Sequence, residues 1–449
     1  MGKPEQFDPR LKAYLHRGAS TPPPDGLEER LIAATRRPRS GWVLQVAAAA
    51  ALLVLAIGLG IALQRARQSV GATTSVSPST SPITKPTPYP TPTSTGAPYP
   101  LQGPASMRMI NASTGWAAGS TTDRILRTID GGAHWDDVTP SGARKGAWTT
   151  FFLDANHAWL GSSIQPGPGS PDFSVTIYRT ADGGRSWQEA GAAAPDQGWP
   201  TSLDFVDANH GWLFVNEGAA AGSQGVALYG TVDGGTTWTK LSETDPNDAT
   251  GGSGHLPFGC SKGQPVFVSI STGWIPGACN AGPVGPLFLV TRDGAKTWNA
   301  VGIALPAGYS GNCMCEIGSL RFADARNGVF VLDLYGSDGQ AHTYLYATHD
   351  GGASWRPGPM LPPNSYTVDF MNATTGWTLD AKTNGLLATS DGGQHWSLVG
   401  PIPTYSNNGI TDYQFVSAQV GWAFGGDFRG LPILKTVDGG RTWTTQLSP

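Results

Sequence analysis

Charged residues are scarce in this chain of 449 residues. Only 14% of the residues are Asp, Glu, Lys or Arg, whereas Gly, Pro and Trp number 61, 36 and 16. Such a composition suits many short strands and turns better than long helices. We therefore expect an all-β fold, and a repeat architecture could take some 350 residues as one unit.

Basic residues are fewer than acidic residues over most of the chain. The first 104 residues contain 11 Lys and Arg against 5 Asp and Glu, whereas the remainder contains 18 against 28. A nucleic-acid partner would need a basic surface facing its phosphates. The acidic main part of the chain therefore argues against nucleic-acid binding.

Cysteine is also scarce, and all four cysteines follow residue 105: Cys260, Cys279, Cys313 and Cys315. Their even number fits disulfides in an oxidising compartment, with three possible pairings. Metal binding is the rival interpretation. No histidine lies at ligand spacing beside them, and Cys313 and Cys315 do not form a CxxC motif. We expect no metal and no other cofactor.

One long apolar run stands out near the N-terminus. Residues 42–63 carry no charge, and a helix of this length spans about 33 Å, enough to cross a bilayer core. We predict an uncleaved transmembrane helix, with a signal peptide as the competing interpretation. Four arginines lie close before the run and two lie close after it, which favours a cytoplasmic N-terminus: Arg30, Arg36, Arg37 and Arg39 against Arg65 and Arg67.

Neither segment that flanks this run is expected to form a folded hydrophobic core. Residues 1–41 are too few, and we expect a short cytoplasmic segment. Residues 64–104 are rich in Pro, Ser and Thr and favour polyproline II, which extends about 3.1 Å per residue. The prediction is a single-pass protein of the cell membrane, with a stalk that holds residues 105–449 outside the cytoplasm.

Seven copies of an octapeptide with the pattern Thr-x-Asp-Gly-Gly-x-x-Trp occupy this main part. They begin at Thr128, Thr180, Thr231, Thr291, Thr348, Thr389 and Thr436. A second element, usually Gly-Trp, precedes each copy, and an alternating apolar stretch precedes that. Each unit therefore predicts four strands: the alternating stretch, the strand of the Gly-Trp element, the strand ending at the Thr and the strand starting at the final Trp.

These octapeptides resemble the Asp-box (BNR) repeat over nearly all of residues 105–449. The resemblance implies that each box forms the hairpin between the third and fourth strands of a propeller blade. We therefore expect a seven-bladed β-propeller of four-stranded antiparallel blades. The repeats begin near Met107 and end near Gln446, so blades one and seven would meet without a strand exchange.

The box residues have a structural chemistry of their own. An Asp side chain accepts hydrogen bonds from turn N–H groups, glycines allow positive φ, and the Trp buries a large ring. In the fourth box Ala295 replaces the second Gly, so we expect a strained or differently shaped turn there. We expect structural rather than catalytic roles for the seven aspartates, Asp130, Asp182, Asp233, Asp293, Asp350, Asp391 and Asp438.

Strand order places the boxes and the first-to-second turns on one face of such a disc. The long, irregular segments fall on the other, which we call the loop-rich face, and loops on a rigid scaffold are common binding sites. Cys260 and Cys279 would flank blade four on that face, so we favour this disulfide. The candidate binding residues there are Trp199, His255, Tyr309, Glu316, Tyr405, Asp427 and Arg429.

Among Asp-box propellers, a single seven-bladed disc most resembles the photosystem II assembly and stability factor group. That resemblance implies a binding or assembly scaffold with a protein partner at the loop-rich face, and no enzyme. A cell-surface receptor that binds a glycan is the alternative, since it would use the same face. A glycoside hydrolase of sialidase type is a further one, but we identify no catalytic residues, and the Arg-Ile-Pro motif usual in sialidases is absent.

Overall fold

The computed structural model describes residues 104–119, 124–143, 147–163, 175–193, 198–220, 223–247, 255–279, 285–309, 313, 315–335, 340–403, 410, 412–424 and 433–447. The predicted cytoplasmic segment, membrane helix and nearly all of the predicted stalk lie outside these residues. Within the described residues, no helix is long and apolar enough to cross a membrane.

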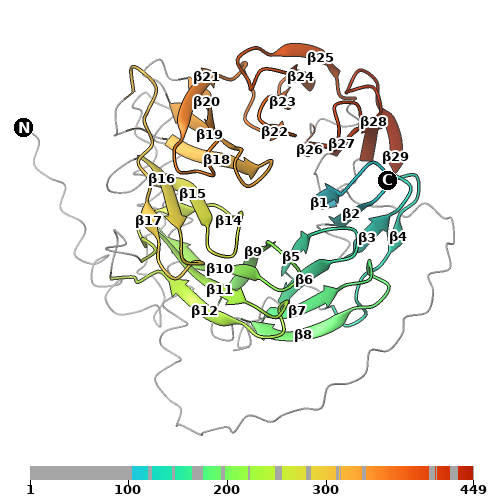
Figure 1. The fold of residues 1–449 in the computed structure, drawn as a ribbon, viewed down its shortest axis with the longest axis vertical. Helices are drawn as coiled ribbons and strands as arrows, with labels where there is room; N and C mark the ends of the chain where they lie inside the picture. The colour runs from blue at the N-terminus through green and yellow to red at the C-terminus, as the bar shows by residue number, and fades with distance from the viewer. Residues whose placement is uncertain are drawn as a thin grey trace, which may run out of the picture. The chain divides into compact units, whose positions relative to one another are not determined.

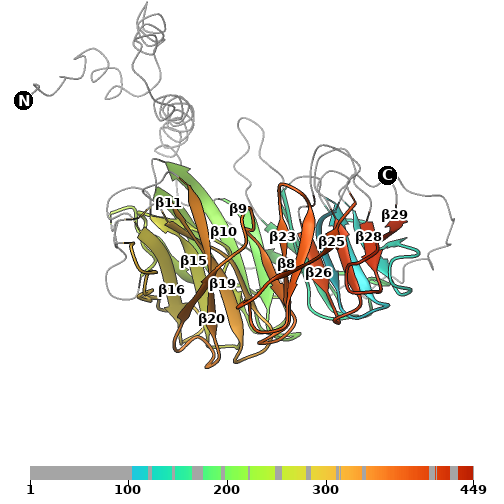
Figure 2. The same ribbon diagram turned by 90° about the horizontal axis from the view of Figure 1, so that it is seen from above.

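Seven antiparallel sheets surround a central axis, as predicted (Figure 1). Seen edge-on, the strands run from one face of the disc to the other (Figure 2). Blades one to three comprise β1 Pro104–Met109, β2 Gly115–Gly119, β3 Ile125–Thr128 and β4 Asp136–Asp137; β5 Ala147–Phe152, β6 Ala158–Ser163, β7 Val175–Thr180 and β8 Gln188–Ala193; and β9 Trp199–Phe205, β10 Gly211–Ala220, β11 Ser223–Thr231 and β12 Thr239–Glu243.

Blade four differs because its first strand is split into two short pieces that both pair with the second strand. It comprises β13 Ser261–Lys262, β14 Val266–Phe267, β15 Gly273–Cys279, β16 Gly285–Thr291 and β17 Asn299–Ala300. The last three blades comprise β18 Cys315–Phe322, β19 Gly328–Tyr335, β20 Ala341–Thr348 and β21 Arg356–Met360; β22 Val368–Phe370, β23 Gly376–Asp380, β24 Gly385–Thr389 and β25 Ser397–Pro401; and β26 Asp412–Phe415, β27 Gly421–Phe424, β28 Ile433–Thr436 and β29 Thr444–Leu447.

The repeat motifs mark the strand ends. Every second strand starts at the first residue of its Gly-Trp element, and every third strand ends at the Thr of the box. The fourth strands begin one residue later than predicted, directly after the box Trp, because the Trp itself completes the turn. Each blade is one continuous stretch of chain, so among the described strands none is exchanged between blades one and seven.

The Asp-box turn is a closed network of hydrogen bonds, shown here for the third box. The Thr231 hydroxyl donates to Asp233 Oδ1 (2.9 Å) and accepts the Gly235 N–H (2.9 Å). Thr237 donates its N–H to Asp233 Oδ1 (2.9 Å) and its hydroxyl to Oδ2 (2.7 Å). All seven boxes repeat these contacts, with a histidine ring in place of the last hydroxyl in two of them.

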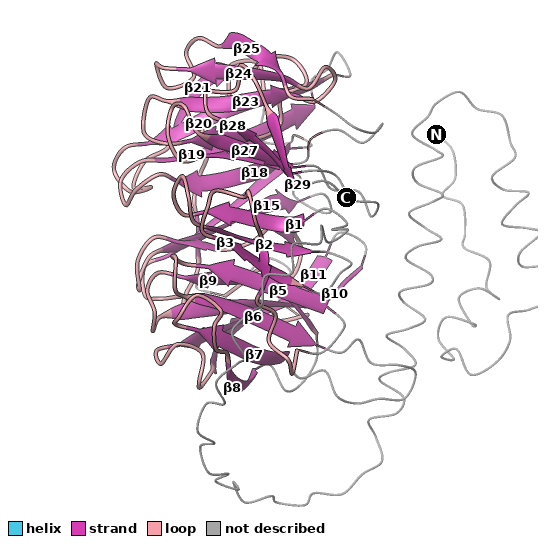
Figure 3. Ribbon diagram, turned by 90° about the vertical axis from the view of Figure 1, so that its right-hand side faces the viewer, coloured by secondary structure: helices cyan, strands magenta, loops and turns pink. Residues whose placement is uncertain are grey.

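These bonds favour the charged carboxylate. The backbone N–H and the ring of His395 lower the pKa of Asp391 to about 2, and the Thr442 hydroxyl and N–H do the same for Asp438. A carboxylate tied to its own turn in this way holds the hairpin together. In the edge-on view of Figure 3, the described turns gather along one face of the disc.

Box four keeps the common turn despite its substitution. Ala295 adopts a φ of 77° and donates its N–H to Thr291 Oγ1 at 2.9 Å, as the glycines do in the other boxes. The expected strain is therefore present, but the expected change of shape is not. The Ala295 side chain is fully buried among Leu228 and Trp298, and this burial offsets part of the strain.

Packing between blades comes from aromatic rings. The Trp of a Gly-Trp element stacks on the aromatic residue that ends the first strand of the next blade, as Trp159 does on Phe205 with ring centres 3.7 Å apart. Trp212 and Trp377 repeat the contact on Phe267 and Phe415 at 3.6 and 3.9 Å. The hydrophobic core therefore lies mainly between blades.

Introducing alanine at the second Gly of a box tests how much strain the turn tolerates. Gly132→Ala would place a Cβ no nearer than 3.5 Å to other atoms, so we expect a loss of about 1–2 kcal/mol in unfolding free energy from the positive φ alone. Gly352→Ala would place its Cβ 2.3 Å from Trp274 and should cost about 1–3 kcal/mol more. Urea unfolding of both variants checks the difference; equal losses would contradict it.

Candidate functional site

The first strands of the seven blades line a central channel, a cavity of about 930 Å³. One position in each strand, the one paired with the Gly-Trp tryptophan or its Val329 counterpart, contributes to the lining in every blade. The seven residues at this position are Arg108, Phe151, Asp204, Val266, Arg321, Asp369 and Gln414. They bring together charges that are far apart in the sequence.

Three of these side chains bridge to the next blade. Asp204 Oδ2 accepts the N–H of Phe267 at 2.6 Å, and Asp369 Oδ2 accepts that of Phe415 at 2.9 Å. Gln414 accepts the N–H of Met109 at 2.8 Å and donates to its carbonyl at 2.9 Å. The last pair joins blade seven to blade one and thereby helps to close the ring.

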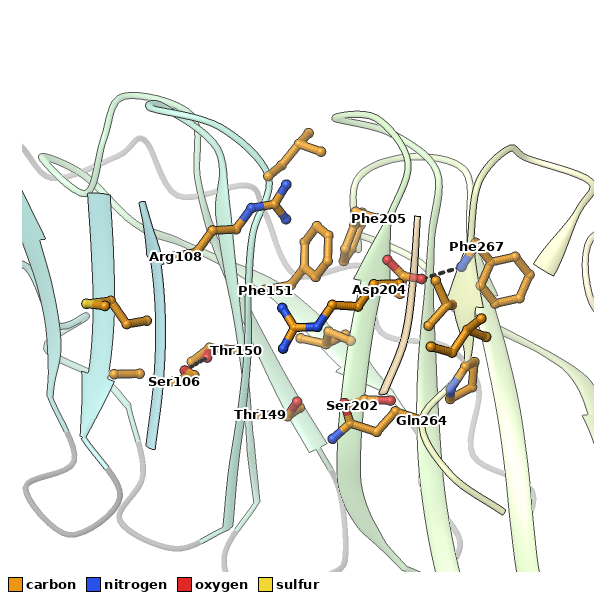
Figure 4. A pocket seen from close by; sticks show the side chains of 18 of the residues that line it. Ser106, Arg108, Thr149, Thr150, Phe151, Ser202, Asp204, Phe205, Gln264 and Phe267 are labelled. Atoms are coloured by element: carbon orange, nitrogen blue, oxygen red, sulfur yellow. Dashed lines mark hydrogen bonds between the residues drawn. The ribbon is translucent and has the colours of Figure 1, made fainter. Parts of the chain in front are cut away.

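Buried charge sets the electrostatics of the channel. Burial raises the pKa of Asp204 to about 7, opposed by the hydrogen bond from Phe267 and the positive charge of Arg108. Arg108 itself lies over the Phe151 ring at 5.6 Å, and Arg321 forms an ion pair with Asp412 at 3.5 Å. Figure 4 shows Asp204 and its hydrogen bond to Phe267, with Arg108 and Phe151 on neighbouring strands.

The channel therefore presents polar and charged groups of both signs rather than an apolar hole. Most of its charged groups already have a protein partner, while Asp204 is poised between its neutral and charged forms at neutral pH. In the part of the chain that the structure describes, no three His, Cys, Asp or Glu residues are grouped to hold a metal ion.

Four of the predicted binding residues are described, and they are spread over the loop-rich face. Trp199 begins β9 and is 47% exposed, Glu316 is exposed in β18, and His255 is exposed ahead of β13. Tyr309 is half-buried, and its hydroxyl is hydrogen-bonded to His342 Nδ1 at 2.6 Å. Its ring also packs against the hydrophobic cluster between blades four and five. The other three candidates lie outside the described residues: Tyr405, Asp427 and Arg429.

Both disulfides belong to the loop-rich side of blades four and five. Cys260 is joined to Cys279 across the first and second strands of blade four, and Cys313 is joined to Cys315 ahead of and at the start of β18. The first is the pairing that the sequence favours. The second is the pairing that the first leaves for the other two cysteines.

Sequence reasoning missed three exposed residues on the same face. Tyr335 ends β19, Met360 ends β21 and Tyr366 leads into β22, with exposed fractions of 59, 51 and 46%. By contrast, the large hydrophobic side chains exposed on the Asp-box face are aliphatic: Ile129, Val232, Ile270 and Val437. Strand direction could have revealed the difference, because it assigns each strand end to one face.

Similarity to known proteins agrees with the propeller. No protein-family model matches the chain. The photosystem II assembly lipoprotein Ycf48 of Synechococcus sp. (strain CC9902) is 25% identical over 295 residues, covering 59% of this chain and 78% of that protein. The propeller is Ycf48-like. The resemblance to the photosystem II assembly factor group that the repeats suggested is thus confirmed.

The Ycf48 match is more complete than the match to an enzyme. A probable oligoxyloglucan-reducing end-specific xyloglucanase of Neosartorya fischeri is also 25% identical, over 230 residues, but this chain spans only 26% of its length. Among solved structures, YCF48 bound to D1 peptide covers 76% of this chain, with 18% sequence identity and a TM-score of 0.48. An ulvan lyase covers 77% of this chain, with 11% sequence identity and a TM-score of 0.44.

The raised pKa of Asp204 predicts a pH dependence of stability. Between about pH 4 and pH 7 the folded protein holds a proton that the unfolded chain has released, so stability falls as the pH rises, by up to about 1.4 kcal/mol per unit. Asp204→Asn keeps the acceptor for Phe267 and should remove this slope. Denaturant unfolding from pH 4 to 8 measures it, with Glu316→Gln as the surface control. A variant slope equal to that of the wild type would refute the assignment.

Proposed function

We propose that this protein is a membrane-anchored, extracytoplasmic scaffold whose propeller binds a protein partner through its loop-rich face. The observation that carries the proposal is the Ycf48 likeness, because a curated relative that is matched over 78% of its length is named an assembly lipoprotein. A rigid disc with loops on one face suits the recruitment of a partner.

The exposed side chains support this choice of face. Trp199, Tyr335, Met360 and Tyr366 are the kinds of side chain that are enriched in protein interfaces, where aromatic anchors contribute much of the binding energy. The Asp-box face instead exposes scattered aliphatic side chains. We therefore place the principal contact with the partner on the loop-rich face, over blades three, five and six.

The location follows from the sequence and the cysteines. The uncharged run of residues 42–63 supplies the anchor, and the arginines around it orient the propeller outside the cytoplasm. Disulfides persist in oxidising compartments, so the Cys260–Cys279 and Cys313–Cys315 pairs support the same side of the membrane.

We propose a binding role rather than catalysis. Glycoside hydrolysis generally uses two carboxyl groups, one of which holds a proton. The box aspartates are tied to their turns, Asp412 is paired with Arg321, and Asp369 is bound to the Phe415 N–H. Among the carboxyl groups that the structure describes, Asp204 is the one whose pKa burial raises to about 7, and it too accepts a backbone N–H from the next blade. The same exposed aromatics could stack on sugar rings, so a glycan-binding receptor is the second candidate.

Site-specific photo-crosslinking in the native membrane tests the proposal. A benzophenone amino acid at Tyr335 or Tyr366 should capture a discrete protein, whereas one at Val232 or Ile129 on the Asp-box face should not. Trp199→Ala combined with Tyr366→Ala should lower the yield at least about tenfold, since each anchor is worth roughly 1–2 kcal/mol.

Both substituted side chains are about half exposed, so thermal unfolding of the double variant should still show a cooperative transition and thereby establish that it is folded. Equal capture from the two faces, or none from the loop-rich face, would contradict the proposal. A glycan array would then test the receptor alternative.

A further inference from the structure

The contact between neighbouring blades is built from three aromatic rings. The Gly-Trp tryptophan of one blade stacks on the aromatic residue that ends the first strand of the next, and the box tryptophan of that next blade meets the same ring edge-on. Phe205 illustrates the unit, with Trp159 stacked at 3.7 Å and Trp238 edge-on at 6.2 Å. Phe267 and Phe415 have the same two kinds of neighbour.

The stacked indole has a second partner on the next blade. Trp159, Trp212 and Trp422 each donate the Nε1–H to the carbonyl of the first Gly in the following box. The acceptors and distances are Gly234 at 2.9 Å, Gly294 at 3.3 Å and Gly131 at 3.1 Å. An indole at this position can thus stack on a ring and donate to a box carbonyl of the next blade, as Trp159 and Trp212 do. Trp422 meets Met109 in place of a ring, and Trp274 stacks on Phe322 without a hydrogen-bond acceptor for its indole.

Blade five lacks this indole, because Val329 replaces the tryptophan. Its partners on blade six remain in place. Phe370 keeps its edge-on neighbour Trp396 at 6.1 Å, and the carbonyl at the acceptor position belongs to Gly392. No described side chain donates a hydrogen bond to that carbonyl. The Phe370 ring and the Gly392 carbonyl are therefore present without the indole that stacks on the equivalent ring and donates to the equivalent carbonyl at the joints after blades two and three.

A cavity of about 420 Å³ occupies this place. Val329, Leu345 and Ala347 of blade five and Phe370 of blade six form its apolar part, and Gly392 also lines it. Ala347 pairs with Val329, whereas the corresponding partners in blades one and seven, Arg127 and Lys435, lie over their tryptophans. The cavity therefore lacks both the indole and the cation that would cover it.

A groove beside Trp159 serves as the internal comparison. It lies at the equivalent place between blades two and three and has a similar volume of about 400 Å³. Trp159 and Arg179 line that groove, but neither Phe205 nor Gly234 does. The indole separates the groove from its own stacking partner, so of these two spaces the cavity at blade five reaches the aromatic ring of the next blade and the groove does not.

We propose that the cavity between blades five and six binds the tryptophan side chain of a partner polypeptide, whose indole stacks on Phe370 and donates its N–H to the Gly392 carbonyl. An apolar cavity of about 150 Å³ can hold a benzene ring, so the space is sufficient for an indole. The site lies on the Asp-box face, apart from the aromatic side chains of the loop-rich face.

The rim points to a polypeptide as the source of the indole. His349 and Arg356 of blade five and Asn372 and Gln394 of blade six line the cavity together with its apolar residues. These side chains offer hydrogen-bond donors and acceptors of the kind that satisfy a peptide backbone beside a buried anchor. A hydrophobic floor with a polar rim is also the usual anatomy of a protein interface.

The test uses the full-length protein in detergent and N-acetyl-L-tryptophanamide as the probe. Ligand-observed NMR should show saturable binding to the wild type, weakened by methylation of the indole nitrogen, which removes the hydrogen donated to Gly392. Val329→Trp restores the side chain that the other six blades carry, so binding should fall at least tenfold while the melting temperature rises. Absence of saturable binding to the wild type would overturn the proposal, as would full binding by the folded variant.

A second variant keeps the test valid if Val329→Trp does not fold. Ala347→Arg introduces the cation that covers the indole in blade one and should close the cavity, again lowering binding at least tenfold. The matched control is Arg179→Ala, which removes a cation beside an indole that stays in place and should create no new binding. Equal binding by Ala347→Arg and the wild type would also overturn the assignment.

Discussion

The fold depends on the stacking of one indole against the next blade. Because each described blade is a continuous stretch of chain, no ladder between the described strands crosses from one sheet to another, and side chains supply most of the contacts between neighbouring blades. The stacked tryptophan, the phenylalanine beneath it and the box tryptophan form that joint, with hydrogen bonds from Asp204, Asp369 and Gln414 reinforcing it on the channel side. The box turn fixes the outer tryptophan, and the first strand fixes the phenylalanine.

The same repetition explains where the molecule has room for function. Positions that serve the joint are nearly invariant from blade to blade, whereas channel positions and strand ends on the loop-rich face vary. The channel position that pairs with the Gly-Trp tryptophan holds arginine, aspartate, glutamine, valine or phenylalanine in different blades. Because the repeated residues supply the packing between blades, the channel positions and the loop-rich strand ends can differ from blade to blade. A departure at a packing position, such as Val329, is therefore easy to recognise.

Sequence alone predicted the architecture because the repeat carries it. The Gly-Trp elements and box threonines gave the ends of the second and third strands, and the error at the fourth strands was one residue. Ala295 showed where sequence reasoning falls short: local rules predicted strain, but burial against Leu228 from blade three allowed the usual turn. The channel charges were missed because Asp204 and Phe267 are 63 residues apart, and only ring closure brings such positions together. The sequence shows that Val329 replaces the usual tryptophan. The cavity that results also depends on Phe370 and Gly392 of blade six, which the structure places beside it.

The continuous blades also decide how the disc would respond to mechanical load. The chain that precedes Pro104 enters the propeller at β1, the innermost strand of blade one. Tension from that direction would act first on the channel wall rather than on the outer rim. On its outer side β1 is held by β2, and toward blade seven the Gln414–Met109 pair holds it without a covalent or sheet connection. The preceding chain thus enters at the seam of the ring, and on the blade-seven side resistance to pulling would rest on a few side-chain contacts.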